Sequence, residues 1–547
     1  MEALTPRASQ VESQRPWRLP WLTPVRCRLI LAAVLCFGFL SHLRYLTNNC
    51  PLDLAGDEAY YWDWSRKLDL SYYSKGPLVA LIMRASCSIF GDVMPAVRLP
   101  ALLLAVGTSL ATYWLTRRLF ASEKLALGSV LLTHLVPIFV AGSILLTIDP
   151  PYYFCWALAT CFAVKAVFDG SRWAWIAIGA AIGVGFLAKY TALAWFVGLL
   201  LFLLFDRDSR RHLRSPWPWI SLAVALLFTT PVLVWNIQHR WVTALHVGTH
   251  GHLETSHMNV LEFFGGQVAT LGPPLAIIMV GAIIWGLRRD RAPRPWRRPV
   301  RFLLWMGLPF YAMVGVMSVW TKVQANWPAA AYFTLMVLTA AFLGSRLANP
   351  LRWHRWRGWV WAAVGFAIVA VPLAHNTELI YPLIERIGRR YALKPERNWL
   401  RQKWDPTHRL RGWRDVAEYI SSQLRQMPPG SFVMCERYEA TAALAFYIEE
   451  QPKTYYVGSW FQNPERRGHY SQYDLWPDRQ LDRPELIGKD AVFLGYEPPR
   501  DLRAAFDHME ALPGLDIRRA GMKIDTLWLW HGYGFKGMHR PADPGKF

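Results

Sequence analysis

Long apolar runs separated by short polar loops limit what this chain can fold into more than any other feature. The runs lie near residues 27–45, 99–115, 125–146, 152–167, 173–187, 193–205, 219–234, 268–287, 302–319, 329–343 and 359–373. An apolar run of roughly 20 residues is the length that crosses a bilayer as a helix, and only 18% of the residues are charged. The sequence therefore predicts an α-helical polytopic membrane protein with about eleven transmembrane helices. The shorter run at residues 78–90 is expected to be re-entrant or interfacial.

The basic residues predict how the chain is oriented. The 60 Lys and Arg outnumber the 39 Asp and Glu, and most arginines fall in every second loop, near residues 117–124, 172, 207–214, 288–301 and 346–357. Loops rich in Lys and Arg stay on the cytoplasmic side. We therefore expect a multi-pass protein of the inner (plasma) membrane with a cytoplasmic tail over residues 1–26 and a membrane domain over 27–374. Because the loop bias explains the positive charge, nucleic acid is not an expected partner.

The segment 375–547 differs in character from the rest of the chain. Short β-like runs at residues 432–435, 454–457, 491–494 and 527–530 alternate there with helical or loop segments. Such alternation predicts a small α/β domain. With an odd number of spans before it, this domain is expected outside the cytoplasm.

The stretch 54–77 places polar residues between two apolar runs. Asp57 and Glu58 begin a segment with four aromatic residues, Tyr60, Tyr61, Trp62 and Trp64. Aromatic side chains of this kind are expected where a helix lies at a membrane surface. Lys75 follows in a turn-rich segment, where its ammonium can meet a phosphate. A structural interpretation stays open, in which Asp57 caps the helix, Glu58 favours its positive end and Lys75 extends its charge along the interface.

Two further charged residues fall on the same predicted side of the membrane. Asp149 lies at the mouth between two spans, followed by Pro150, and Lys189 lies at the outer end of another span. Asp149 also fits a helix N-cap with Pro150 in the first helical position. Lys189 also fits a lysine whose stem covers apolar surface while its charge reaches water.

The third outer loop is rich in histidine. His246 and His250 are four residues apart, so on a helix they would share one face and could hold a metal ion with a carboxylate. Gly248 and Gly251 interrupt such a helix, which favours a solvated polar loop. A divalent cation held by His246 and His250 is therefore the alternative interpretation of this loop.

Outward carboxylates beside cations suit a reaction in which a hydroxyl or amine attacks a sugar carbon bonded to phosphate. One carboxylate acts as general base, and the cations hold the leaving phosphate. A donor whose phosphate is attached to a lipid presents its head group at the interface, where these residues are expected. The candidate catalytic residues are Asp57, Glu58 and Asp149, and the candidate phosphate-binding residues are Lys75, Lys189 and Tyr73.

Six motifs carry a resemblance to a known family. They are Asp57-Glu58-Ala59-Tyr60-Tyr61-Trp62, Tyr72-Tyr73-Ser74-Lys75-Gly76-Pro77, Thr147-Ile148-Asp149-Pro150, Leu187-Ala188-Lys189-Tyr190-Thr191, Glu262-Phe263-Phe264-Gly265-Gly266-Gln267 and Asn326-Trp327-Pro328. Together they resemble the polyprenyl- or dolichyl-phosphate-sugar glycosyltransferases of the GT-C fold, close to protein mannosyltransferases and the lipid A aminoarabinose transferase. The resemblance covers roughly residues 28–345, and segments near 437–447 and 471–476 are similar to the extra-membrane domain of many bacterial members.

The resemblance implies transfer of a sugar, with inversion, from a polyprenyl-phosphate donor to a lipid, glycan or protein acceptor outside the cytoplasm. It implies that Asp57 activates the acceptor, Asp149 is a second carboxylate of the site, and Lys75 binds the lipid phosphate. Ser74 stands where the aminoarabinose branch has a glutamate, which puts the metal site of that branch in doubt. Gly76 replaces the first proline of the family's Tyr-x-Lys-Pro-Pro element.

A secondary transporter or a flippase of a lipid-linked sugar is the main alternative. Ion-coupled transporters usually place charges or broken helices in the middle of the membrane. Here Asp57, Asp149 and Lys189 fall near the ends of apolar runs, which favours chemistry at the interface.

Overall fold

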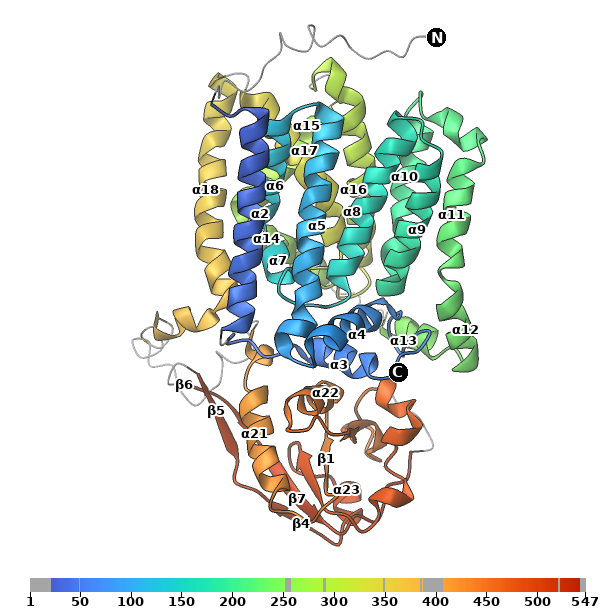
Figure 1. Cartoon of the computed structure of the whole chain (residues 1–547), viewed down its shortest axis with the longest axis vertical. Coiled ribbons are helices and arrows are strands. Elements are labelled where there is room, and N and C mark those ends of the chain that lie inside the picture. Colours follow the sequence, from blue (N-terminus) through green and yellow to red (C-terminus); the bar gives the residue numbers. More distant parts are fainter. Residues whose placement is uncertain are drawn as a thin grey trace.

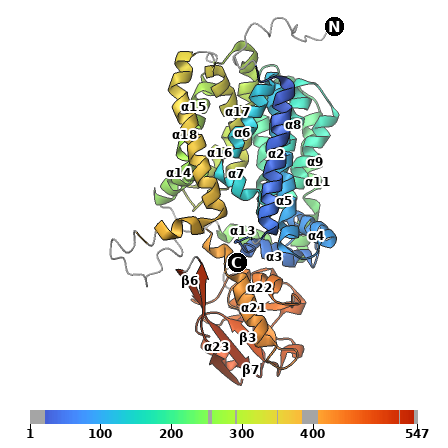
Figure 2. The same ribbon diagram turned by 60° about the vertical axis from the view of Figure 1, so that its left-hand side comes forward.

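The computed structural model describes residues 21–48, 50–250, 257–288, 292–347, 350–383, 386, 407–519 and 522–541. A bundle of long helices forms one part of the molecule, and a domain with a β-sheet forms the other (Figure 1). Three short helices lie between these parts in both views, α3 (Gly56–Ser65), α4 (Leu78–Phe90) and α13 (Val242–His250) (Figures 1 and 2). The segments with the candidate site residues therefore lie where the bundle meets the C-terminal domain.

The bundle contains long apolar helices and shorter ones joined end to end. They are α2 (Pro24–Thr47), α5 (Met94–Phe120), α6 (Glu123–His134), α7 (Pro137–Gly142), α8 (Asp149–Phe168), α9 (Trp173–Ala188), α10 (Trp195–Phe205), α11 (Trp217–Leu227), α12 (Thr230–Gln238), α14 (His257–Leu271), α15 (Pro273–Leu287), α16 (Arg297–Met317), α17 (Ala329–Leu347) and α18 (Pro350–His375). Polar caps begin some of them. The hydroxyl of Thr23 accepts a hydrogen bond from the N–H of Arg26 at the start of α2, and Ser122 does the same for Leu125 in α6.

Each predicted apolar run contains helix, but the lengths differ from expectation. Among the described residues, seven helices are long and apolar enough to cross a membrane. The number becomes eight if the pair Asn259–Leu271 and Pro273–Leu287, bent by 105°, counts as one span. The multi-pass helical fold is thus confirmed, whereas the expected number of about eleven transmembrane helices is not. The run at residues 125–146 differs most, because it divides into α6 and α7.

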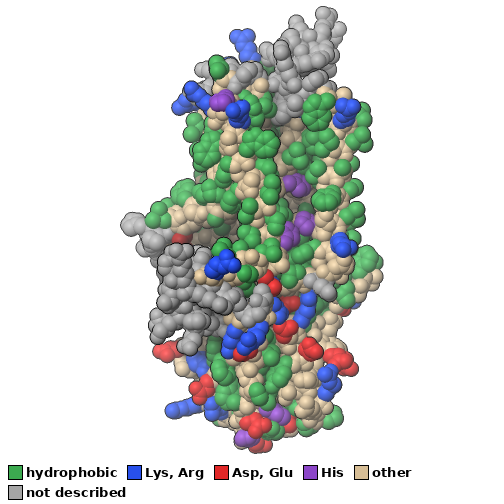
Figure 3. Space-filling model, turned by 90° about the vertical axis from the view of Figure 1, so that its left-hand side faces the viewer, with side chains coloured by type: hydrophobic (Ala, Val, Ile, Leu, Met, Phe, Trp, Pro, Cys, Tyr) green, Lys and Arg blue, Asp and Glu red, His purple; other side chains and the backbone are tan. Residues whose placement is uncertain are grey.

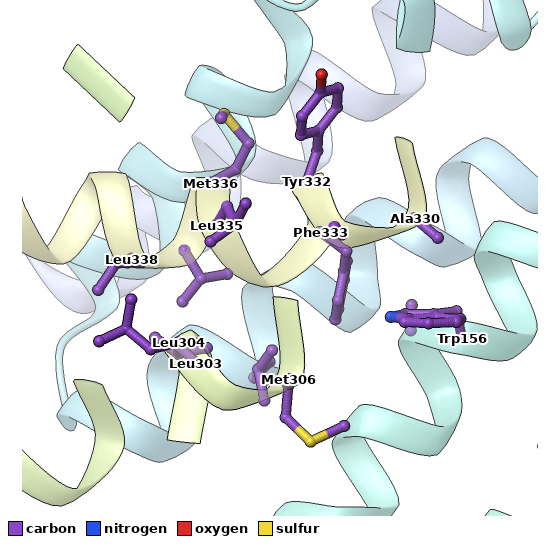
Figure 4. Packing of buried hydrophobic residues seen from close by; sticks show 14 of the residues in the cluster. Trp156, Leu303, Leu304, Met306, Ala330, Tyr332, Phe333, Leu335, Met336 and Leu338 are labelled. Atoms are coloured by element: carbon purple, nitrogen blue, oxygen red, sulfur yellow. The ribbon is translucent and has the colours of Figure 1, made fainter. Parts of the chain in front are cut away.

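The core of the bundle surrounds α17, which is buried along most of its length. Figure 4 shows side chains of α17 facing Leu303, Leu304 and Met306 of α16, with Trp156 of α8 beside them. Gly307 permits this close contact, because a Cβ there would lie 2.5 Å from the hydroxyl of Thr334. Packing at this density leaves helices little freedom to shift. The loop that leads into α17 is therefore held in a fixed position relative to α8.

Charged side chains gather at the ends of the bundle. On the face drawn in Figure 3, hydrophobic side chains cover the middle of the bundle, with Lys and Arg at one end and mixed charges over the C-terminal domain. The end remote from that domain is tied by ion pairs from Arg28 and Arg117 to Glu123, and from Arg298 and Arg301 to Asp206. The arginine-rich loops named above therefore meet at one end, as the alternation of loops predicts.

The C-terminal domain is α/β, as predicted. Its five-stranded sheet has the order β2-β1-β3-β7-β4, and a separate hairpin pairs β5 with β6. The strands are β1 (Phe432–Cys435), β2 (Thr454–Tyr456), β3 (Ala491–Leu494), β4 (His508–Ala511), β5 (Leu515–Arg519), β6 (Met522–Leu527) and β7 (Leu529–Tyr533). β1 is parallel to β2 and β3, whereas β7 is antiparallel to β3 and β4. Helix α21 (Trp413–Leu424) precedes β1, and α22 (Tyr438–Tyr447) follows it and packs against α3.

The aromatic residues of α3 do not form a membrane-surface belt, so that interpretation is wrong. Tyr60, Tyr61, Trp62 and Trp64 are at most 5% exposed. The C-terminal domain packs on Tyr60 and Trp62, and Trp64 stacks on Tyr72 of the loop before α4. The hydroxyl of Tyr60 accepts a hydrogen bond from the N–H of Gln472 at 2.5 Å. The ring of Trp62 meets that of Phe446 edge-on, with centroids 4.9 Å apart. Helix α3 is thus enclosed between two parts of the protein, and its N-terminal turn is held rigidly.

Candidate active site

Asp57 lies in the first turn of α3, but it does not cap that helix. The backbone N–H of Ala55 donates instead to Oε2 of Glu58 at 2.9 Å. Within the described part of the chain, the Asp57 carboxylate makes no hydrogen bond or ion pair of its own. Its side chain remains exposed. The capping interpretation therefore applies to Glu58, and Asp57 is free to act on a bound molecule.

Glu58 is buried and fully engaged by the protein. Its carboxylate forms an ion pair with Arg98 of α5 at 2.8 Å, in which neither side chain is exposed. The N–H of Leu146 donates to its Oε1 at 2.9 Å. Glu58 thus joins α3 to α5 and to the segment before α8. This geometry does not support the catalytic role predicted for Glu58, since a carboxylate with its acceptors filled cannot take a proton from a substrate.

Asp149 is held by two polar side chains from other parts of the bundle. Nζ of Lys189 lies 2.8 Å from its Oδ1, and the amide of Asn326 donates to its Oδ2 at 2.6 Å. The N-cap of α8 is Ile148, and Asp149 is the first residue of the helix. Asp149 is therefore not an N-cap, and Lys189, only 14% exposed, is not a lysine extended into water. The structure brings together three loops that are far apart in the sequence.

Lys75 reaches this cluster because its loop presses against the end of α9. The loop turns where the N–H of Tyr72 donates to the carbonyl of Lys75 at 3.0 Å. A Cβ on Gly76 would lie 2.3 Å from the carbonyl oxygen of Leu187, so only glycine fits there. Gly76 is the position at which this chain departs from the Tyr-x-Lys-Pro-Pro element. Among the described residues, the Lys75 ammonium has no hydrogen bond or ion pair.

The electrostatic environment of Lys75 and Asp57 is that of a partly enclosed site. Burial, and then the neighbouring charge of Lys189, lowers the pKa of Lys75, while Asp57 and Asp149 act in the opposite direction. Asp57 keeps contact with solvent, but the surrounding protein removes much of its water and raises its pKa. The carboxylate of Glu439 raises the pKa of Asp57 further. Asp57 and Lys75 are thus oppositely charged neighbours without a direct bond.

Tyr73 and His246 lie beside the Lys75 loop. Tyr73 is 3% exposed, its N–H donates to Gln472 at 2.7 Å, and its ring packs on that of His246 with centroids 4.6 Å apart. His250 ends α13, and its side chain lies outside the described residues. Within the described ranges, no group of three or more His, Cys, Asp or Glu side chains converges. A divalent cation bound by His246 and His250 stays a prediction.

Three residues of the cluster were not predicted as site residues. Asn326 belongs to the motif Asn326-Trp327-Pro328 named above. The sequence signal for this residue was therefore a polar amide next to a tryptophan and a proline. Arg409 and Glu439 both act electrostatically on Asp57, yet they come from the C-terminal part of the chain. Their approach depends on how two domains dock, and no local pattern in the sequence indicates it.

The arrangement can perform one kind of chemistry well. A carboxylate without a partner can accept a proton from an attacking hydroxyl or amine. An ammonium without a partner can bind and stabilise a leaving phosphate. The contacts of Asp149 with Lys189 and Asn326 hold these three side chains in place within the cluster. The site therefore suits displacement of a phosphate from a substrate by an activated nucleophile.

Comparison with known proteins gives relatives along most of the chain. Residues 74–235, which include Lys75, Asp149 and Lys189, match the family model described as dolichyl-phosphate-mannose-protein mannosyltransferase. The lipid A galacturonosyltransferase RgtD of Rhizobium johnstonii is 27% identical over 370 residues, which are 66% of this chain and 75% of that one. An undecaprenyl phosphate-α-4-amino-4-deoxy-L-arabinose arabinosyl transferase of Pseudomonas aeruginosa is 28% identical over 284 residues, 49% of each chain.

A solved structure shares the fold. The crystal structure of ArnT from Cupriavidus metallidurans, bound to undecaprenyl phosphate, superposes with a TM-score of 0.60 and 16% identity. The match covers 92% of this chain and 97% of that one. The likeness therefore extends over both the helical bundle and the C-terminal domain, and it confirms the fold that the sequence motifs predicted.

Proposed function

We propose that this chain is a GT-C membrane glycosyltransferase that uses a polyprenyl-phosphate sugar, which its relatives and its fold support, and that Asp57 and Lys75 form the centre of its transfer site. Asp57 takes a proton from the acceptor hydroxyl or amine as that group attacks the anomeric carbon. The bond between this carbon and the phosphate oxygen breaks, and the lipid phosphate leaves with the electron pair. Attack from the side opposite the phosphate inverts the anomeric configuration.

Lys75 and Lys189 have different roles in this proposal. The Lys75 ammonium binds the leaving phosphate, because it has no partner in the described part of the protein. Lys189 bonds to Asp149 at 2.8 Å, so it adds positive potential and holds Asp149 in place. Tyr73 lines the loop that presents Lys75 and is the third phosphate-binding candidate. Asp149, the second carboxylate, holds Lys189 and Asn326 in place beside the transfer site.

One observation carries the proposal. Asp57 and Lys75 are near enough to influence each other's pKa, yet each lacks a bond to any described residue. Charged groups in a partly enclosed site normally find partners. A substrate that supplies an acidic proton to one and a phosphate to the other would satisfy both groups.

The proposal also covers orientation and partners. The arginine-rich end of the bundle is cytoplasmic under the positive-inside rule, so the site and the C-terminal domain face outward from the inner membrane. The donor is a polyprenyl-phosphate sugar, as named for the Pseudomonas relative. The acceptor is a lipid, glycan or protein on that outer side. Because the relatives are named as transferases, a flippase or transporter is set aside.

The experiment compares cells that contain this chain with cells that lack it. Mass spectrometry of envelope lipids, glycans and proteins should detect one glycosyl increment that depends on the chain and disappears in the Asp57→Asn variant. The mass of the increment identifies the sugar, and the molecule that carries it identifies the acceptor. Identical glycosylation in the two strains, with the protein present in the membrane, would contradict the proposal.

A further inference from the structure

The C-terminal domain reaches the first turn of α3 through α22. A Cβ on Gly56 would lie 2.5 Å from Cβ and 3.1 Å from Cγ of Glu439. Gly56 is the residue directly before Asp57, so the Glu439 side chain starts beside the turn that carries the proposed base. The ring of Tyr438 packs on that of Tyr60 with centroids 5.0 Å apart. These contacts fix α22 against α3 and place Glu439 close to Asp57.

Among the described residues, Glu439 forms only a weak ion pair within its own domain. Its ion-pair contact is with Arg437 at 3.5 Å, and the Arg437 side chain is 66% exposed. Exposed pairs of this kind contribute roughly 0–1 kcal/mol to stability. The Glu439 side chain itself is 29% exposed, so a carboxylate is held at the domain junction without a strong partner among the described residues.

Four charged groups act on Asp57, and the ionisable side chains of Tyr61 and Tyr438 also lie near it. Glu439 on α22 and Glu58 on α3 are negative, whereas Lys75 in the loop before α4 and Arg409 before α21 are positive. Glu439 has the largest influence of the four. Glu58 is already neutralised by Arg98 at 2.8 Å, so Glu439 is the negative charge beside Asp57 that lacks a strong partner of its own.

We propose that Glu439 is a positioning residue of the transfer site, whose carboxylate beside the first turn of α3 strengthens Asp57 as a proton acceptor and thereby makes the C-terminal domain part of the active site. The inference rests on the proposed role of Asp57 as base. Like charges placed close together cannot both ionise easily, so the Glu439 carboxylate makes Asp57 a stronger proton acceptor. Removing the charge of Glu439 should make Asp57 a weaker base, and it removes no group that touches the substrate.

The experiment follows the protonation of Asp57 in the full-length protein. A water-soluble carbodiimide labels protonated carboxyl groups, and peptide mass spectrometry measures labelling of Asp57 across the acid pH range. In Glu439→Gln, the pH at which Asp57 labelling falls to half should move lower by about half a unit or more, as expected for loss of one nearby charge. Glu439→Asp should restore most of the shift. Glu449→Gln, which removes an exposed carboxylate beyond the end of α22, should leave the profile unchanged.

Undecaprenyl phosphate separates this inference from the proposed function. If it protects Asp57 from labelling in the wild type and the Glu439→Gln profile shifts, both are supported. A shifted profile without protection supports the coupling of Glu439 to Asp57 and counts against the proposed function alone. An identical profile in the wild type and the folded Glu439→Gln variant overturns the inference, whatever undecaprenyl phosphate does.

Discussion

Two neighbouring carboxylates at the start of α3 have opposite surroundings. Glu58 points into the protein, where Arg98 and backbone N–H groups fill its acceptors. Asp57 faces the junction with the C-terminal domain and bonds to no described residue. Near the other end of α3, Asp63 resembles Glu58, because it is buried and pairs with buried Arg479 at 3.1 Å. Within one short helix, the buried carboxylates are paired and the exposed one is not.

This difference in pairing distinguishes carboxylates that stabilise the fold from one that can take part in a reaction. Desolvating an ion is unfavourable unless close, well-aligned partners compensate for it, and Glu58 and Asp63 have such partners. A protein gains no stability from leaving Asp57 and Lys75 unpaired beside each other. Their state is useful only when another molecule binds between them. Residue type alone therefore does not identify the catalytic carboxylate, whereas the completeness of its hydrogen bonds does.

The largest effect expected from this comparison is on stability. Glu58→Gln leaves Arg98 buried without its counter-ion, which should lower the free energy of unfolding by about 3–5 kcal/mol. Thermal unfolding in detergent measures this loss of stability. The control is Glu449→Gln, which breaks an exposed ion pair with Arg425 and is expected to change stability by less than about 1 kcal/mol. Wild-type stability in Glu58→Gln would mean that the pair does not hold α3 to α5.

Lys75→Ala should affect binding more than stability. Loss of one charge-assisted contact to a phosphate is worth about 1.5–3 kcal/mol, or roughly 10- to 150-fold in Kd. Titration of the purified protein with undecaprenyl phosphate measures this change. Lys453→Ala, which removes a half-exposed lysine of the C-terminal domain, is the matched control. Equal affinity in the wild type and Lys75→Ala would remove Lys75 from the phosphate site.

The smallest effect is on the pH dependence of transfer. Asp57 must be ionised to act as base, and its raised pKa moves the acid limb of kcat/KM to higher pH than for an ordinary aspartate. Lys75 must be charged to bind phosphate, and its lowered pKa moves the alkaline limb to lower pH than for an ordinary lysine. Lys75→Arg keeps its charge at all these values of pH, so its alkaline limb should move up or disappear. An unchanged alkaline limb would assign it to another group.

The sequence predicted more of the membrane part than of the junction between domains. Apolar runs located the helices because a bilayer requires about 20 such residues in succession, and Asp57, Lys75, Asp149 and Lys189 do gather in one place. The sequence could not show that Glu58 pairs with Arg98, since that contact joins residues 40 positions apart. It also misplaced Tyr60 and Trp62 at the membrane surface, because an aromatic segment at an interface looks the same whether lipid or protein covers it.

Asp57→Asn tests the central claim most directly. Since Asp57 neither caps α3 nor pairs with a described residue, the substitution should leave thermal unfolding within about 0.5 kcal/mol of the wild type. Loss of a general base should lower the rate of a single turnover with the polyprenyl-phosphate sugar donor by roughly 10²- to 10⁴-fold. Near-normal transfer by a well-folded Asp57→Asn protein would contradict the account and make Asp149 the leading candidate for the base.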